Sequence, residues 1–285
     1  MPAHRNWLVE TGWLAQHLDA PDVVILDASF HLPGSGRDAP AEFRDSHIPG
    51  AMFFDIDDIA DTNNPLPHML PPAEKFASRM RRMGIGDGMR IVIYDKTNMA
   101  GAARAWWMFR VMGSKDVAVL NGGFGKWQAE NLPVESGEAR PRSERHFTAR
   151  VNSGLIRDQA DVIALMQNGQ MQIVDARSSG RFAGTDPEPR AVPRLGHIPG
   201  AKNVPFTELL GDGNTMLSPH EIKAVMAAHG VDPVRAVVAS CGSGVTACVI
   251  ALALATTGAE MTAVYDGSWA EWGASDAPVE TGPES

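Results

Sequence analysis

Cysteine is scarce in this sequence: its 285 residues include only Cys241 and Cys248. The two lie on one predicted strand-to-helix segment, where we do not expect them to pair with each other. A disulfide-stabilised fold is therefore excluded, and a reducing compartment such as the cytoplasm fits. Clusters of Lys and Arg are lacking as well, and the formal net charge is −9. That charge balance argues against nucleic acid or an anionic membrane as a partner.

The sequence also lacks a segment that would carry it into or across a membrane. Charged and titratable residues between positions 5 and 19 interrupt any apolar core of a signal peptide. Residues 236–259 contain no charged residue, but Cys-Gly-Ser-Gly at 241–244 divides this run. The helix that remains is shorter than the about 20 residues that a membrane span needs. We therefore expect a cytoplasmic protein that has no membrane partner.

The chain contains one unit written twice. The pentapeptide His-Ile-Pro-Gly-Ala occurs at 47–51 and again, letter for letter, at 197–201. Other segments recur in the same order: 24–28 matches 172–176, and 118–127 matches 263–272. We interpret His47 and His197 as features of the fold, since both copies keep them and only one copy carries a candidate nucleophile.

Each copy alternates short runs rich in Val and Ile with helical patterns, which predicts an α/β fold. We expect tandem duplicated domains, each a mostly parallel sheet with helices on both faces. Residues 132–154 contain two prolines, two glycines and mixed charges, which indicate a linker, placed at 137–154. The predicted domains are thus 1–136 and 155–285. The aromatic residues Trp106, Trp107 and Phe109 are predicted to lie in the core.

Cys241 is the candidate nucleophile. A short apolar strand precedes it, and we expect an apolar helix to begin near Ser243 or Val245. Gly242 and Gly244 allow the backbone amides of the loop to converge on an anion, and the positive end of a helix favours an anion by about 0.3–1 kcal/mol. Both effects favour a thiolate at this position. Cys248 lies two turns into the apolar helix, where we interpret it as structural.

The first copy carries Asp95 at the position of Cys241. A carboxylate in a glycine-poor loop cannot carry sulfane sulfur. We therefore expect the first domain to be catalytically silent and to form one wall of a cleft.

With these motifs the chain resembles the two-domain rhodanese-fold sulfurtransferases over nearly its whole length. Its Cys-Gly-Ser-Gly-Val-Thr loop resembles the branch of this family whose sulfur donor is 3-mercaptopyruvate, whereas thiosulfate-specific members carry basic residues after the cysteine. The resemblance implies a persulfide on Cys241 and release of pyruvate. It also implies transfer to a thiol acceptor such as thioredoxin or glutathione, or to cyanide, with no metal or organic cofactor. The residues that it assigns to substrate binding in the loop are Gly242, Gly244, Val245 and Thr246.

The resemblance further implies that two arginines hold the donor's carboxylate and keto oxygen. They match Arg181 and Arg190 in the segment Gly-Arg-Phe-Ala-Gly-Thr-Asp-Pro-Glu-Pro-Arg. The alternative is that either is an exposed arginine of a proline-rich loop. Arg194 has no counterpart in the family and is expected at the surface.

The resemblance also implies a proton relay in which Ser243 is supported by His68 and Asp57. Prolines around His68 stiffen its loop and could hold it toward the second domain. Two alternatives stay open from the residues alone: Asp57 caps a helix that starts near position 58, and His68 is an ordinary surface imidazole.

Three other functions compete with this prediction. A thiosulfate:cyanide sulfurtransferase would use the same fold. A phosphatase of the Cys-x5-Arg type would share the loop-helix geometry, but this chain has Ala247 where that loop ends in arginine. A non-catalytic persulfide carrier or binding module would keep Cys241 without turning over 3-mercaptopyruvate.

Overall fold

The computed structural model describes residues 6–169, 171–232 and 234–283. They form two compact units, each assembled from separate stretches of the chain. The first runs to Asp61 and adds Pro71–Asn152 and Asp212–Thr215, while the second comprises Thr62–Leu70, Ser153–Gly211 and the chain from Met216. Each unit thus includes a short segment from the other half of the sequence, an exchange that the predicted boundaries did not anticipate.

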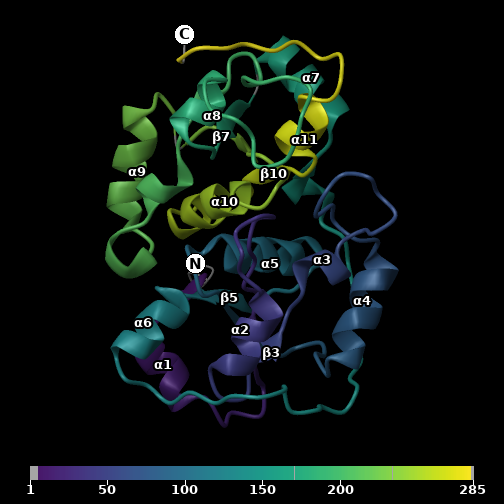
Figure 1. The fold of residues 1–285 in the computed structure, drawn as a ribbon, viewed down its shortest axis with the longest axis vertical. Coiled ribbons are helices and arrows are strands. Elements are labelled where there is room, and N and C mark those ends of the chain that lie inside the picture. Colours follow the sequence, from purple (N-terminus) through teal and green to yellow (C-terminus); the bar gives the residue numbers. More distant parts are fainter. Residues whose placement is uncertain (1–5, 170, 233, 284–285) are drawn as a thin grey trace. The chain divides into compact units, whose positions relative to one another are not determined.

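Both units contain a five-stranded, fully parallel sheet flanked by helices, which confirms the predicted α/β duplication (Figure 1). The strand order is β1-β5-β4-β2-β3 in the first sheet and β6-β10-β9-β7-β8 in the second, so corresponding strands occupy corresponding places. The strands of the first sheet are β1 (Leu8–Val9), β2 (Val23–Asp27), β3 (Met52–Phe53), β4 (Arg90–Tyr94) and β5 (Val117–Leu120). Those of the second are β6 (Ile156–Arg157), β7 (Gln172–Asp175), β8 (Lys202–Asn203), β9 (Val237–Ser240) and β10 (Ala263–Tyr265).

The helices follow the same duplication. The first unit has α1 (Thr11–Gln16), α2 (Ala39–Asp45), α3 (Ile56–Ile59), α4 (Ala73–Arg82), α5 (Ala100–Val111), α6 (Gly123–Ala129) and the 3₁₀ turn η3 (Asp212–Asn214). The second has η1 (Ser153–Leu155), α7 (Gln159–Asn168), α8 (Ser179–Ala183), η2 (Phe206–Leu209), α9 (Pro219–Ala228), α10 (Ala247–Thr256) and α11 (Ser268–Trp272).

The helices that follow the two central strands are buried on every side. All residues of α5 are buried, including the predicted core residues Trp106, Trp107 and Phe109, none of which is exposed. In α10, the residues from Ala247 to Ala255 are buried. Of the two, α10 is apolar on every face, as helices of a protein core or of a membrane are, whereas α5 also buries Arg104 and Arg110. Among the described residues, no helix combines the length and apolar character that crossing a bilayer requires.

The repeated histidines support the fold, as predicted. His47 stacks on Phe43 with ring centroids 4.0 Å apart, and its Nδ1 lies 2.8 Å from the Phe43 carbonyl oxygen. His197 stacks on Phe182 at 3.7 Å, with Nδ1 at 2.9 Å from the Phe182 carbonyl. Because both are buried and make the same contacts, they are equivalent structural residues of the two copies.

The segment 137–152 has no helix or strand and lies along the first unit. The Gly137 amide donates to the Arg44 carbonyl at 2.7 Å, and the Arg150 amide donates to the Met112 carbonyl at 2.8 Å. Phe147 is buried against the rings of Phe76 and Phe109. These contacts fix most of the predicted linker to the first unit.

Candidate active site

Cys241 follows directly on β9, and its side chain is buried, with 2% of the residue exposed. The start of α11 holds its backbone. The Cys241 amide donates to the Ser268 hydroxyl at 3.1 Å, and the Cys241 carbonyl accepts from the Trp269 amide at 2.9 Å. The Gly242 carbonyl accepts from the Ala270 amide at 2.9 Å. The backbone of the first two loop residues is therefore fixed by hydrogen bonds to the start of α11.

The loop continues to Thr246, which caps α10, so the helix begins at Ala247 and later than predicted. The physical reason is Gly244, whose φ of 75° lies in the left-handed region and is incompatible with an α-helix that starts at Ser243. Val245 is buried, with 5% of the residue exposed. In α10 the Cys248 thiol donates to the Gly244 carbonyl at 3.2 Å, which agrees with its predicted structural role.

In the corresponding loop of the first unit, backbone amides donate hydrogen bonds to a carboxylate. The Asp95 carboxylate accepts hydrogen bonds from the backbone amides of Thr97, Met99 and Ala102, at 3.0, 3.1 and 3.0 Å. Burial raises the pKa of Asp95, and these amide bonds act against that rise. In the second unit the Cys241 sulfur accepts no hydrogen bond from the described residues.

Arg181 lies against the loop. It belongs to α8, and a Cβ atom built on Gly242 would lie 2.5 Å from its Nη2. Its Nε and Nη2 donate to one oxygen of Glu188, at 3.2 and 2.5 Å. The alternative of an exposed loop arginine is therefore wrong for Arg181: it is a helical, half-buried and paired cation beside the residue that follows Cys241.

Glu188 is a site residue that sequence reasoning missed. Its side chain is 5% exposed and also accepts from the fully buried Arg177, whose Nη1 lies 2.7 Å away. Arg177 in turn bonds Asp175 at the end of β7 and lies over the Trp269 ring. Burial alone lowers the pKa of Arg177, but the two carboxylates outweigh it and raise that pKa. A chain of alternating charges thus connects the sheet to Arg181.

Only one feature of the sequence could have indicated Glu188. It stands between two prolines in the segment that carries both predicted arginines. Its partner Arg177 carried no signal, because one arginine after a strand does not reveal that its guanidinium is buried.

Arg190 and His68 meet within the second unit, to which both belong. The Arg190 Nη2 donates to His68 Nε2 at 2.8 Å. Because arginine has no acceptor, His68 must accept at Nε2 and is then the neutral tautomer with its proton on Nδ1. His68 is 5% exposed, so its interpretation as a surface imidazole is wrong. The Leu70 amide, which donates to Asp266 at 2.7 Å, ties the same segment to this unit.

Asp57 belongs to the first unit and lies in the first turn of α3. The helix cap is Asp55, whose carboxylate accepts from the Asp57 and Asp58 amides at 3.0 and 3.1 Å. The alternative that Asp57 itself is the cap is therefore wrong. The grouping of Asp57 and His68 with Ser243 stays a prediction.

Arg194 is not the surface residue that we expected. Its side chain is half-buried and donates to carbonyl oxygens of the C-terminal segment, at 2.7 Å to Ala277 and 3.0 Å to Trp272. It anchors that segment, and the sequence carried no sign of this because the acceptors are all backbone groups.

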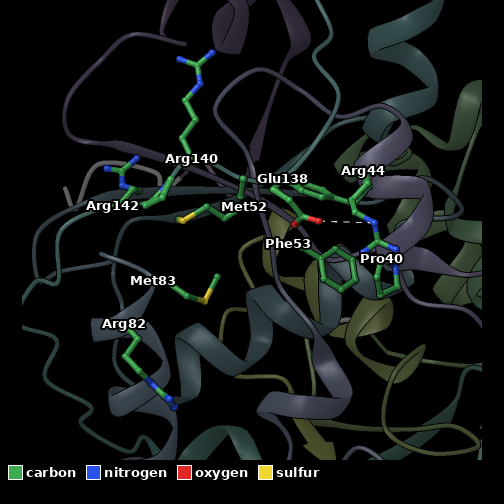
Figure 2. A pocket seen from close by; sticks show the side chains of 12 residues that line it. Pro40, Arg44, Met52, Phe53, Arg82, Met83, Glu138, Arg140 and Arg142 are labelled. Carbon is green, nitrogen blue, oxygen red and sulfur yellow. Dashed lines mark ion pairs between the residues drawn. The ribbon is translucent and has the colours of Figure 1, made fainter.

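A pocket of about 320 Å³ in the first unit, drawn in Figure 2, offers no comparable chemistry. Met52, Phe53 and Met83 give it an apolar surface, and four arginine side chains lie around it. One of them, Arg44, pairs with Glu138 at 3.9 Å. The described residues that line it include no cysteine, so they provide no thiol for sulfur transfer. Nor does the described part of the chain hold a group of three His, Cys, Asp or Glu side chains that could bind a metal.

Comparison with known proteins relates this chain to one family of sulfurtransferases. The model of the family described as "Rhodanese-like domain" matches residues 10–130 and 158–275. The 3-mercaptopyruvate sulfurtransferase of Escherichia coli K12 is 43% identical over 277 residues, covering 96% of this chain and 98% of that protein. The thiosulfate sulfurtransferase of Rattus norvegicus is 42% identical over 93% of this chain and 91% of its own length.

A solved structure agrees with these relatives. The crystal structure of SseA from Escherichia coli superposes with a TM-score of 0.85 at 41% identity. That structure is described as showing the rhodanese fold and catalytic mechanism of 3-mercaptopyruvate sulfotransferases. The superposition covers 93% of this chain and 99% of that one. Two family matches, near-complete coverage by relatives and the duplicated parallel sheets lead to one conclusion. The chain belongs to the rhodanese-like domain family.

Proposed function

We propose that this protein is a sulfurtransferase that takes sulfur from 3-mercaptopyruvate and passes it, through a persulfide on Cys241, to a thiol or to cyanide. The observation that carries the proposal is the place of Arg181, whose guanidinium lies against Gly242 while the loop itself contains no basic residue. A donor whose negative charge is several bonds away from its sulfur needs its cation beside the loop and not within it. The names of relatives at 43% identity and nearly full coverage support the same donor.

The first half-reaction forms a bond between Cys241 Sγ and the donor sulfur and breaks the donor's carbon–sulfur bond. The electron pair of that bond leaves with the carbon as the enolate of pyruvate, which takes up one proton to become pyruvate. The residue left on the enzyme is a cysteine persulfide. We assign Arg181 and Arg190 to the donor's carboxylate and keto oxygen, where their charge stabilises the enolate.

The loop amides of Gly242, Gly244, Val245 and Thr246 are proposed to hold the outer, negatively charged sulfur. The carboxylate of Asp95, bonded by three amides of the equivalent loop, supports this assignment.

The second half-reaction is attack of an acceptor on that outer sulfur. A thiolate such as that of glutathione or thioredoxin takes the sulfur as a persulfide and returns Cys241 as a thiolate. A second thiol then releases sulfide as a disulfide forms. Cyanide takes the sulfur in one step as thiocyanate. No metal or organic cofactor is required by either step.

We also propose that Ser243, supported by His68 and Asp57, carries the protons that the first half-reaction moves. The hydrogen bond from Arg190 to His68 adds a condition, because Nε2 of His68 cannot accept from Ser243 while it accepts from Arg190. We therefore propose that His68 positions Arg190 in the resting enzyme, and that any proton transfer through His68 Nε2 follows release of this bond.

The experiment that tests the function compares two donors and two cysteines. Pyruvate release is measured with 3-mercaptopyruvate, and kcat/KM for this donor is compared with that for thiosulfate. Intact and peptide mass spectrometry after donor addition should show one added sulfur at Cys241 and none at Cys248. The matched variants Cys241→Ser and Cys248→Ser should respectively abolish and retain turnover.

The alternatives make different predictions in the same assays. A higher kcat/KM for thiosulfate would identify a thiosulfate:cyanide sulfurtransferase; the relative at 42% identity is named thiosulfate sulfurtransferase. A persulfide on Cys241 without pyruvate release would identify a sulfur carrier. Sulfur found on Cys248 would refute the assignment of the nucleophile.

We further propose a domain division at 1–136 and 155–285 with a linker at 137–154, supported by family matches at 10–130 and 158–275. The first domain is proposed to be catalytically silent, because Asp95 replaces the nucleophile there. We also propose a cytoplasmic location, where a reducing environment would keep both cysteines as thiols.

A further inference from the structure

Ser268 has a backbone conformation that a serine seldom adopts. Its φ is 50°, in the left-handed region where glycine is favoured and other residues are strained. It is also completely buried. Such strain persists only where the surrounding structure enforces it, and it concentrates at functional sites. The position therefore needs an explanation beyond the fold.

The first copy shows that the fold itself is satisfied by glycine at this position. The segment Asn121-Gly122-Gly123-Phe124 aligns with Asp266-Gly267-Ser268-Trp269, and Gly123 has a φ of 55°. The adjoining backbone bond is the same in both copies: the Phe124 amide donates to the Asp95 carbonyl at 3.0 Å, and the Trp269 amide donates to the Cys241 carbonyl at 2.9 Å. Only the copy that carries the thiol has a side chain here.

That side chain makes two hydrogen bonds in a fixed direction. The Ser268 hydroxyl donates its single proton to the Tyr265 carbonyl at 2.8 Å. A lone pair of the same oxygen then accepts the Cys241 amide at 3.1 Å. With the Trp269 bond, both backbone groups of the nucleophile are held by the first turn of α11. The serine thus adds to the nucleophile a bond that glycine could not make.

We propose that Ser268 is a positioning residue for Cys241, retained in a strained conformation because its hydroxyl fixes the Cys241 amide and so the place of the sulfur in the loop. The inference rests on the proposed sulfur transfer and deepens it. Ser268 does not touch the donor in this account, so its loss should lower the rate of persulfide formation and leave donor binding unchanged. A serine kept only for packing would affect neither.

The test uses Ser268→Gly, which removes the hydroxyl and also the strain, so that relief of the strain offsets part of the cost of losing the two hydrogen bonds and the variant is expected to fold. Ser268→Ala removes the hydroxyl and keeps the strain. Ser275→Gly is the matched control, because the Ser275 hydroxyl also bridges backbone groups, the Trp272 carbonyl and the Ala277 amide, without touching Cys241.

Single-turnover persulfide formation, kcat and KM for 3-mercaptopyruvate are measured for each, together with thermal unfolding. We expect both Ser268 variants to form persulfide at least tenfold more slowly than the parent, with KM within about threefold, and Ser275→Gly to match the parent in rate.

Parent-like persulfide formation in a folded Ser268→Gly would overturn the proposal for Ser268 and leave the sulfurtransferase function standing. A rise in KM with unchanged kcat would overturn it as well, since it would place Ser268 in donor binding. A parent enzyme that releases no pyruvate would instead refute the proposed function, and the inference would fall with it.

Discussion

Replacing Asp95 should destabilise the first unit by an amount that its hydrogen bonds allow us to estimate. One carboxylate oxygen accepts from the Thr97 and Met99 amides, and the other accepts from the Ala102 amide. Asparagine keeps the first oxygen but turns an NH₂ group toward Ala102, leaving one buried donor unsatisfied at a cost of about 1–3 kcal/mol. Alanine leaves three such donors, and we expect a loss of about 3–5 kcal/mol once entering water satisfies some of them.

The assay is urea unfolding followed by tryptophan fluorescence. Five of the seven tryptophans belong to the first unit, so its transition dominates the signal. Asp116→Asn is the control, because Asp116 is exposed and pairs with Arg90 at the surface, where such pairs contribute about 0.2–1 kcal/mol. A loss below about 1 kcal/mol for Asp95→Ala, or equal losses for both Asp95 variants, would refute the view that this carboxylate holds the loop together.

The same residue predicts a pH dependence whose sign follows from its burial. Burial raises the pKa of Asp95 in the folded chain, so on raising the pH the unfolded chain loses this proton first. The stability that the parent has over Asp95→Asn should therefore be greatest at about pH 4 and fall as the pH rises through the folded pKa. Repeating the urea series between about pH 4 and pH 7 tests this, and an advantage that grows with pH would contradict the direction of the shift.

Two further substitutions test the cations of the site. Gly242→Ala would put a Cβ atom 2.5 Å from the Arg181 Nη2, so the guanidinium must move: we expect kcat/KM for 3-mercaptopyruvate to fall about tenfold or more, with a loss of stability below about 1 kcal/mol. The matched change Gly125→Ala meets no atom within 4 Å and should leave kinetics unchanged while stabilising α6 by up to about 1 kcal/mol; equal kinetics for both variants would remove Arg181 from the site. For His68, glutamine offers Arg190 an acceptor and alanine does not, so His68→Gln should retain most of the donor affinity that His68→Ala loses. Equal losses of kcat in both variants, with KM unchanged, would favour a proton-carrying His68 instead.

The sheets could be predicted because each central strand is a short apolar run that can be recognised within its own segment of the sequence. Runs such as Val23–Asp27 and Arg90–Tyr94 are mostly apolar, as strands buried on both faces of a parallel sheet are. Because each run has a counterpart in the other copy, the assignment in one copy supported the assignment in the other. The nucleophile was predictable for the same reason, since a strand, a cysteine and a glycine-containing loop are consecutive in the sequence. Local order is what sequence reasoning recovers well.

Contacts between segments that are distant in the sequence could not be predicted from it. Glu188 looked like a loop carboxylate until its two arginine partners were placed, and Ser268 looked like a variant of Gly123 until its φ and its bond to Cys241 were known. His68 had two open interpretations because its hydrogen-bond partner Arg190 lies more than a hundred positions away in the sequence. Which aspartate caps α3 was decided by the backbone of Asp55, which is extended where Asp57 is already helical.

The exchange of segments between the units limits how this chain can be divided. A fragment cut at 137–154 and ending with the second unit would lack Thr62–Leu70, and with it the acceptor for Arg190 and the amide that bonds Asp266. Its counterpart would lack Asn214, whose side chain donates to the Thr97 carbonyl at 2.7 Å. Neither half is thus self-sufficient, although both have the same strand order. A chimera that combines halves of two relatives would keep both units intact only if its crossovers also carried these two short segments along.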